Sequence, residues 1–256
     1  MKSLLAFIRK EWTGHLRSGR VLIFGILFLF FGILGPATAM LTPRLYEMLA
    51  DSFAGAGIVF TGVTVTALDS WVQFFKNMPI VLVVFILLES SVFTREYRSG
   101  TLLLSLTKGL ERWKIVAAKT VIPVILWTLC YWLCFGVTYG YTGYFWDNAV
   151  VQNLPFSAGC WWLFGLWAVM LMVLFSTVSA SNTGVLAGTG GIILLCVLLG
   201  IFPHVSKYLP TLLMDGNSLI FGMNKPETYT LSLVVTAVTA AACFVVSIPV
   251  FNRKQL

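Results

Sequence analysis

The longest stretches of this sequence without a charged residue limit what it can fold into. There are 59 uncharged residues between Asp147 and Lys207, and 27 between Lys119 and Asp147. About 20 apolar residues in a helix cross the hydrocarbon core of a bilayer, where charged side chains are expensive. The chain is 58% hydrophobic and 11% charged, whereas a soluble domain carries about 25% charged residues. A water-soluble enzyme and a disordered chain are therefore excluded.

Six membrane-spanning helices account for the uncharged stretches. The longest stretch divides at the small polar residues between Ser176 and Gly184. The sequence thus predicts an all-α polytopic membrane protein with one transmembrane domain over residues 1–256. Pro123 is expected in the first turns of the third span, where proline is tolerated. The predicted spans are residues 21–41, 77–93, 118–141, 158–179, 185–203 and 229–250.

The distribution of basic residues predicts the orientation. Thirteen of the 17 Lys and Arg residues fall in the N-terminal segment, the loop between spans two and three, and the C-terminal tail. Cytoplasmic loops carry an excess of Lys and Arg, so both termini are predicted to be cytoplasmic. The net charge of +7 then reflects topology and attraction to anionic lipid headgroups. No nucleic-acid partner is expected.

Residues 1–19 are predicted to form an amphipathic helix lying on the inner leaflet of the membrane. At 100° per residue its basic side chains fall on one face and its large apolar side chains on the other. Two interpretations stay open, an anchor that only sets topology and an interfacial helix with a role in function. The apolar face consists of Leu4, Leu5, Ile8, Trp12 and Leu16.

Two outer segments, 42–76 and 204–228, are predicted to connect spans on the side of the membrane opposite the cytoplasm. The first is expected to begin with a helix from Pro43 to Ala50. Its Val- and Thr-rich part, residues 57–68, indicates a short strand or hairpin. The second contains two prolines and a helical stretch.

The sequence holds no self-contained catalytic site. It contains no zinc-binding HExxH pattern, no phosphate-binding GxxxxGK[ST] loop and no GxSxG elbow. The five cysteines fall in predicted spans, where thiols act as small apolar residues, and packing is favoured over metal binding. The chain is therefore predicted not to be an enzyme and to hold no metal or cofactor.

Glu89 is the one acidic residue within a predicted span. A carboxylate at the bilayer centre costs about 3 kcal/mol on insertion scales, and intramembrane charges mark functional sites in transporters. Arg95 is a candidate partner for this carboxylate. A secondary transporter normally shows more polar groups inside the bundle, or broken helices in paired positions, so Glu89 alone supports that class weakly.

The loop after span two has an apolar centre between basic residues. Gly100 and Thr101 predict the start of a short helix, and Lys108 and Gly109 predict its end. Such a helix would either rest on the inner leaflet or fill a groove in a partner protein. Its apolar face would consist of Leu102, Leu103 and Leu106.

This loop resembles the signature of type-2 ABC exporter permeases. The pattern E-x-x-x-G-T-L-x-x-x-L-T runs from Glu96 to Thr107 and is followed by Arg112 and Lys119. The Lys-Glu-Trp element at residues 10–12, the sequence FFKN at residues 74–77 and the order of six spans are also similar to that family. The chain departs from the family pattern at Gly109, where the family has proline.

The resemblance implies a permease subunit without ATPase activity, working as a dimer of identical or homologous copies in a bacterial plasma membrane. A separate ATP-binding subunit would dock beneath it and hold ATP and Mg²⁺. Residues 94–116 would contain the coupling helix, and residues 1–19 would be the elbow helix. By position, the residues contacting the ATPase would be Glu96, Arg98, Gly100, Thr101, Leu102, Leu103, Leu106 and Arg112.

The apolar interior predicts an amphipathic or apolar cargo, such as a peptide antibiotic, a drug or a lipid. Two alternatives stay open. One is a secondary transporter or channel that works without ATP. The other is a membrane scaffold that recruits a cytosolic partner through residues 94–116.

Overall fold

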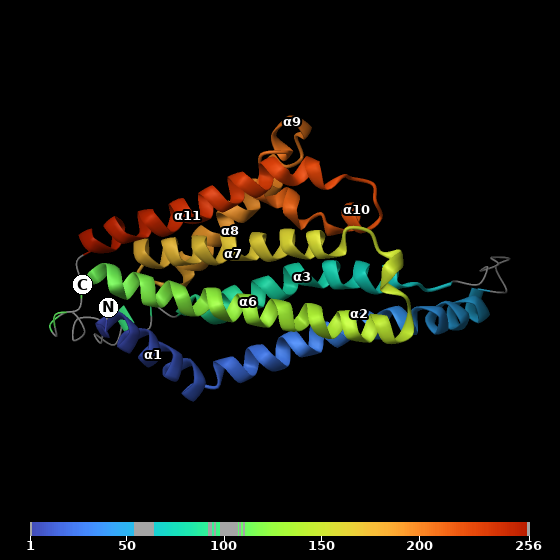
Figure 1. Cartoon of the computed structure of the whole chain (residues 1–256), viewed down its shortest axis with the longest axis horizontal. Helices are drawn as coiled ribbons and strands as arrows, with labels where there is room; N and C mark the ends of the chain where they lie inside the picture. The colour runs from blue at the N-terminus through green and yellow to red at the C-terminus, as the bar shows by residue number, and fades with distance from the viewer. Residues whose placement is uncertain are drawn as a thin grey trace.

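Six long apolar helices make up most of the molecule (Figure 1). The computed structural model describes residues 2–53, 64–91, 94, 96–97, 107, 109 and 111–254. All six are long and apolar enough to cross a membrane, and the described residues contain no strand. The all-helical fold class and the number of spans are confirmed. The helices are α2 (Arg20–Phe53), α3 (Ala67–Glu89), α6 (Arg112–Phe145), α7 (Leu154–Val178), α8 (Asn182–Leu199) and α11 (Thr230–Arg253).

A seventh helix, α1 (Lys2–Arg17), precedes the bundle and meets α2 at an angle (Figure 1). Gly19 joins the two helices with a φ of 72°, a left-handed conformation that glycine adopts without steric cost. The reversal lets α1 pack against α6 and α2. Both ends of the described chain lie at the same end of the bundle (Figure 1), as an even number of spans requires.

The outer segment 42–76 is shorter than the sequence analysis predicted. Helix α2 continues without a break to Phe53, and α3 begins at Ala67. Thr66 and Asp69 form a capping box, which fixes the start of α3 ten residues before the predicted span. Arg44 and Lys76 are the charges that set the predicted limits. Both residues lie inside helices. A charged residue indicates where the apolar stretch ends, but the helix can continue past it.

The strand predicted in residues 57–68 is absent from the described part of that stretch. Residues 64–66 have no regular structure, and Ala67 and Leu68 belong to α3. Residues 57–63 lie outside the described residues. The helix predicted from Pro43 to Ala50 is not a separate element, because it is the last part of α2.

Helices α2 and α6 are longer than a bilayer requires. Each has 34 residues, or roughly 51 Å at about 1.5 Å per residue, against a hydrocarbon core of about 30 Å. Because α6 begins at Arg112, Pro123 lies well inside the helix, not in its first turns as predicted.

Helix α7 is the centre of the bundle. About 61% of its most apolar part is buried within the chain, against 11% for α8. Helix α7 packs against α11 and α8, while α2 packs against α3 and α6. Trp127 of α6 donates a hydrogen bond to the carbonyl of Trp162 in α7, with a distance of 3.0 Å from Nε1 to O. Its ring packs edge-on against Phe28 and Phe85, which joins α2 and α3 to the same core.

The segment between α8 and α11 folds back onto the bundle, away from the two termini (Figure 1). Trp161 donates to the carbonyl of Met214 at 2.8 Å, and Ser157 donates to that of Gly216 at 3.2 Å. These bonds satisfy backbone carbonyls that would otherwise be buried without partners. The segment contains four short helices, α9 (Pro203–Ser206), η3 (Pro210–Met214), α10 (Gly216–Ile220) and η4 (Pro226–Tyr229).

Close contact between α6 and α7 depends on Gly165, because a Cβ there would overlap the Trp127 indole. We expect Gly165→Ala to lower the free energy of unfolding by about 1–3 kcal/mol, the usual cost of overpacking a core. Gly159→Ala is the matched control in the same helix, since a Cβ at Gly159 meets nothing within 4 Å. Denaturant unfolding in detergent measures both changes, and equal stabilities for the two variants would contradict the packing assigned to Gly165.

Candidate functional site

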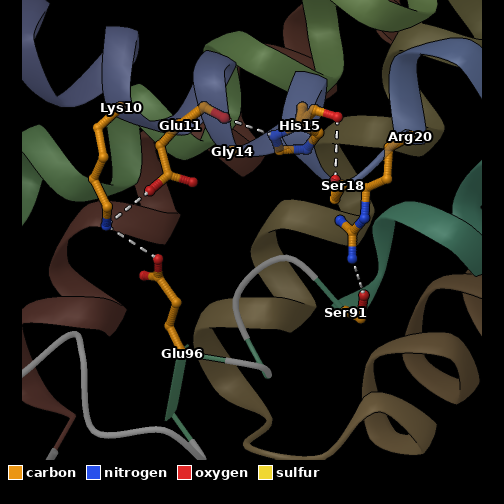
Figure 2. Close-up of a pocket in the computed structure, with 8 residues that line it drawn as sticks. All are labelled: Lys10, Glu11, Gly14, His15, Ser18, Arg20, Ser91 and Glu96. Atoms are coloured by element: carbon orange, nitrogen blue, oxygen red, sulfur yellow. Dashed lines mark hydrogen bonds and ion pairs between the residues drawn. The ribbon is translucent and has the colours of Figure 1, made fainter.

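Three segments distant in sequence meet near the two termini. They are α1, the start of α6, and the residues that follow α3 (Figure 2). Glu96 is the first residue of the loop signature, and the structure places it in this junction. The charged side chains that join the three segments form an ion cluster of Lys10, Glu11, Glu96 and Lys119.

In the ion cluster each carboxylate contacts both ammonium groups. Lys119 Nζ lies 3.2 Å from Glu11 Oε2 and 3.0 Å from Glu96 Oε2. Lys10 Nζ lies 3.4 Å from Glu11 Oε1 and 3.4 Å from Glu96 Oε1. The side chains of Lys119 and Glu11 are 1% and 8% exposed. Burial of an ion costs several kcal/mol, which only close pairing offsets.

The environment of Glu96 favours its charged form. Burial alone would raise the pKa of this carboxyl. The charge of Lys119 and its hydrogen bond, together with Lys10, outweigh burial and lower the pKa below its ordinary value. Glu96 therefore stays ionised and keeps the loop signature tied to α1 and α6.

A second buried contact joins α1 to the end of α3. His15 Nε2 lies 3.3 Å from Glu89 Oε2, and His15 Nδ1 lies 3.0 Å from the carbonyl oxygen of Glu11. A carbonyl only accepts, so Nδ1 carries a proton, and Nε2 donates to the carboxylate when the ring is fully protonated. The other oxygen of Glu89, Oε1, is buried and makes no hydrogen bond with the described residues.

The pKa of His15 is raised by Glu89. Burial is the largest influence and would lower the pKa, but the hydrogen bond with Glu89 and its negative charge act together with the Glu11 carbonyl to raise it. Arg20 opposes this rise more weakly. The contact predicted between Glu89 and Arg95 falls outside the described residues, and His15 is the partner that the structure shows.

The C-terminal tail binds the end of α7, at the end of the bundle where the termini lie. Lys254 Nζ donates to the carbonyls of Thr177 at 2.9 Å and Ser179 at 3.1 Å, at the end of α7. The same ammonium lies 4.1 Å above the Tyr97 ring, and Tyr97 donates to the carbonyl of Ser176 at 3.2 Å. Carbonyls in the last turn of a helix have no helical donors, so these side chains cap α7.

Arg112 caps the end of α11. Its Nη1 atom donates to the carbonyls of Phe251 at 3.2 Å, Asn252 at 2.8 Å and Lys254 at 2.8 Å. The role predicted for Arg112, contact with an ATPase, stays a prediction. The structure adds that this side chain already binds the tail of its own chain.

The predicted site residues have different outcomes. Glu96 and Arg112 lie among the described residues at this end of the bundle. Gly109, in the described part of the loop, has a φ of 81°, which proline cannot adopt. The other predicted coupling residues, Arg98, Gly100, Thr101, Leu102, Leu103 and Leu106, lie outside the described residues.

The apolar face of α1 that is predicted to lie on the inner leaflet is partly exposed. Leu5 and Leu16 are 64% and 51% exposed. Leu4, Ile8 and Trp12 are partly buried against the core. The buried side chains of α1 are Phe7, Glu11 and His15, which lie four residues apart.

Sequence reasoning missed Glu11, His15, Tyr97 and Lys254 as members of the site. The spacing of Glu11 and His15 indicates that they share one face of α1. It does not identify their partners, Lys119 and Glu89, which lie 108 and 74 residues away in the chain.

Comparison with known proteins agrees with the loop signature. The sequence pattern of the family described as "ABC-2 family transporter protein" matches residues 5–256. The chain is also similar to "Uncharacterized transmembrane protein YxlG" of Bacillus subtilis (strain 168). The two are 22% identical over 218 residues, which cover 82% of this chain and 81% of that protein.

Removal of the Lys119 ammonium would leave the buried Glu11 carboxylate and the half-buried Glu96 carboxylate poorly compensated. We expect Lys119→Met to lower the free energy of unfolding by about 3–5 kcal/mol, as found when one partner of a buried ion pair is removed. Denaturant unfolding in detergent, followed by tryptophan fluorescence, measures the loss. Lys114→Met is the control, because Lys114 pairs with the exposed Glu111 and such pairs contribute little. Unfolding of both variants at the wild-type denaturant concentration would contradict the ion cluster.

The His15–Glu89 contact makes stability depend on pH. A group whose pKa is raised in the folded state contributes stability that is fully present below its ordinary value of 6.5 and is lost as pH rises through the raised value. We therefore expect the thermal midpoint of the wild type to decrease as the pH is raised from 6.5 upward. The midpoint of His15→Gln should change less over this range. Equal slopes for the two proteins would show that the contact contributes nothing.

Proposed function

The chain belongs to the ABC-2 family of transporter proteins and is a component of membrane transport, and on this premise we propose that it is the permease subunit of an ATP-driven exporter. Two copies, or one copy and a homologue, form the pathway in a bacterial plasma membrane. A separate ATP-binding subunit holds ATP and Mg²⁺ and docks on the segment between α3 and α6. The permease itself carries out no catalysis.

The attachment of both ends of that segment carries the proposal. At its start, Glu96 binds α1 and α6 through the ion cluster, and Tyr97 binds the end of α7. At its end, Arg112 binds the last carbonyls of α11. A displacement of the segment by a partner therefore reaches four helices directly. This arrangement supports a rigid movement of helices driven from one end of the bundle.

The same end of the bundle is proposed to be cytoplasmic. The termini and both ends of the segment lie together there (Figure 1), and 13 of the 17 basic residues belong to these parts of the sequence. An excess of Lys and Arg in cytoplasmic loops supports this orientation.

Exposed apolar helices support the proposal of a dimer. Only 11% of the apolar part of α8, 22% of α11 and 28% of α2 is buried within the chain. Lipid covers such surfaces in a monomer, and a second copy covers some of them in a dimer. Tight packing of helices in a membrane favours small residues, and Gly190 and Gly191 of α8 have open space beside them.

The proposed cargo is amphipathic or apolar, such as a peptide antibiotic, a drug or a lipid. The core around α7 consists largely of aromatic and aliphatic side chains, including Trp127, Tyr131 and Phe164. An ionic cargo needs groups that compensate its charge, and the buried acidic and lysine side chains of the described residues, Glu11, Glu89 and Lys119, lie at the end of the bundle near the termini.

Copurification tests the proposal. We expect the tagged chain, extracted from native membranes in mild detergent, to bring down an ATP-binding subunit with measurable ATPase activity. Leu103→Asp should reduce the recovered activity at least ~10-fold, because it places a charge on the apolar face expected to fill the partner's groove, where about 1.4 kcal/mol changes binding tenfold. Met223→Asp is the control, since Met223 is 76% exposed and lies in the segment between α10 and η4.

The outcomes separate the proposal from its alternatives. Recovery of the ATPase with the wild type and Met223→Asp, but not with Leu103→Asp, supports the exporter. Absence of an ATPase from all eluates contradicts it and favours a transporter or channel that works without ATP. Recovery of the partner without any ATP-dependent transport in liposomes would favour a scaffold.

A further inference from the structure

A polar cavity lies beside the ion cluster, between α1, the first residue of α2 and the residues after α3 (Figure 2). Its volume is about 170 Å³, whereas about 10–15 Å³ is enough for a single water molecule. The cavity therefore has room for a group much larger than one water. Its lining residues are Lys10, Glu11, Gly14, His15, Ser18, Arg20, Ser91 and Glu96.

Arg20 supplies the donors on one side of the cavity. Its Nη2 atom donates to Ser91 Oγ at 2.8 Å, and within the described residues this is the one hydrogen bond that its guanidinium makes. A guanidinium has five N–H donors and binds the oxygens of a phosphate in pairs. Figure 2 shows Arg20 and Ser91 on one side of the cavity and Lys10 with Glu96 on the other.

Among the described residues around the cavity, the charges leave an excess of one positive unit when His15 is protonated. The carboxylates of Glu11 and Glu96 are matched by Lys10 and Lys119, and that of Glu89 by His15. The Arg20 guanidinium has no carboxylate in this group. A phosphodiester, with a single negative charge, would neutralise it.

The surroundings of Arg20 indicate a lipid as the source of the phosphate. Arg20 is the first residue of a candidate membrane span, so it lies at the level of the headgroups. On either side of it in the chain, Leu16, Leu22 and Ile23 are 51%, 67% and 47% exposed. Exposed apolar side chains at this level are available for contact with the acyl chains of a lipid.

We propose that this cavity binds the phosphate of an inner-leaflet phospholipid, with the Arg20 guanidinium as its main ligand and the Lys10 ammonium at its edge. The bound headgroup lies between α1, α2 and the start of the loop signature. It completes the junction that the ion cluster holds from the other side. The site does not depend on an ATPase partner, so its test is independent of the proposed function.

Native mass spectrometry of the purified chain tests the site. The protein is titrated in detergent with phosphatidylglycerol and, separately, with a diacylglycerol that has the same acyl chains and no phosphate. We expect one phosphatidylglycerol to be retained per chain and the diacylglycerol not to be retained. Arg20→Gln should weaken retention at least ~10-fold, as expected for loss of a hydrogen bond to a charged group.

A second variant fills the cavity without removing a polar group. Gly14 lines the cavity and a Cβ there meets nothing within 4 Å, so Gly14→Leu places a larger side chain beside the open space and should also weaken retention at least ~10-fold. Two changes serve as controls and should leave retention unchanged. Arg17→Gln removes an exposed charge of α1 outside the cavity, and Gly140→Leu adds the same side chain at another open glycine.

Four outcomes would overturn the proposal. They are equal retention of the diacylglycerol, unchanged retention in both Arg20→Gln and Gly14→Leu, equal losses in the controls, and release of the lipid by millimolar inorganic phosphate. The last result would assign the site to free phosphate. Retention of phosphatidylglycerol that depends on Arg20 and on open space at Gly14 supports the lipid site.

Discussion

The ammonium of Lys119 is buried near the end of the bundle where the termini lie, with 1% of its side chain exposed. A charge in that position must be compensated within the protein. The carboxylates that compensate it come from α1 and from the residues after α3. The need to compensate this one charge therefore holds α1, α6 and the residues after α3 together. The position of α1, the path of the chain after α3 and the cavity beside Arg20 all depend on this arrangement.

At the same end of the bundle, hydrogen bonds from cationic side chains to backbone carbonyls also hold segments together. Helix ends leave four carbonyls without helical donors. Here Lys254 donates to those of α7, and Arg112 donates to those of α11. A cationic side chain near a helix C-terminus also interacts favourably with the helix dipole. The cations that predicted the orientation of the chain thus also join its helices to one another.

The number of spans and the fold class could be predicted because hydrocarbon excludes charge, and the uncharged stretches record this directly. The ends of α2 and α3 could not, since both helices extend beyond the charged residues Arg44 and Lys76 that set the predicted limits. The site was predicted only where a local pattern carried it, at Glu96 and Arg112. The pairing of His15 with Glu89 joins residues 74 apart. Periodicity shows which residues share a face, but it does not show that this face meets a buried carboxylate.

The position of Pro123 in α6 matters for the ion cluster. Proline has no N–H, so it cannot donate to the carbonyl four residues earlier, and that residue is Lys119. The regular ladder of α6 is therefore interrupted one turn after the ammonium that joins α1 to the loop signature. A helix bends at such a point without breaking a hydrogen bond. A bend at this point would turn the part of α6 that carries Lys119 together with α1, relative to the longer part that continues across the bundle.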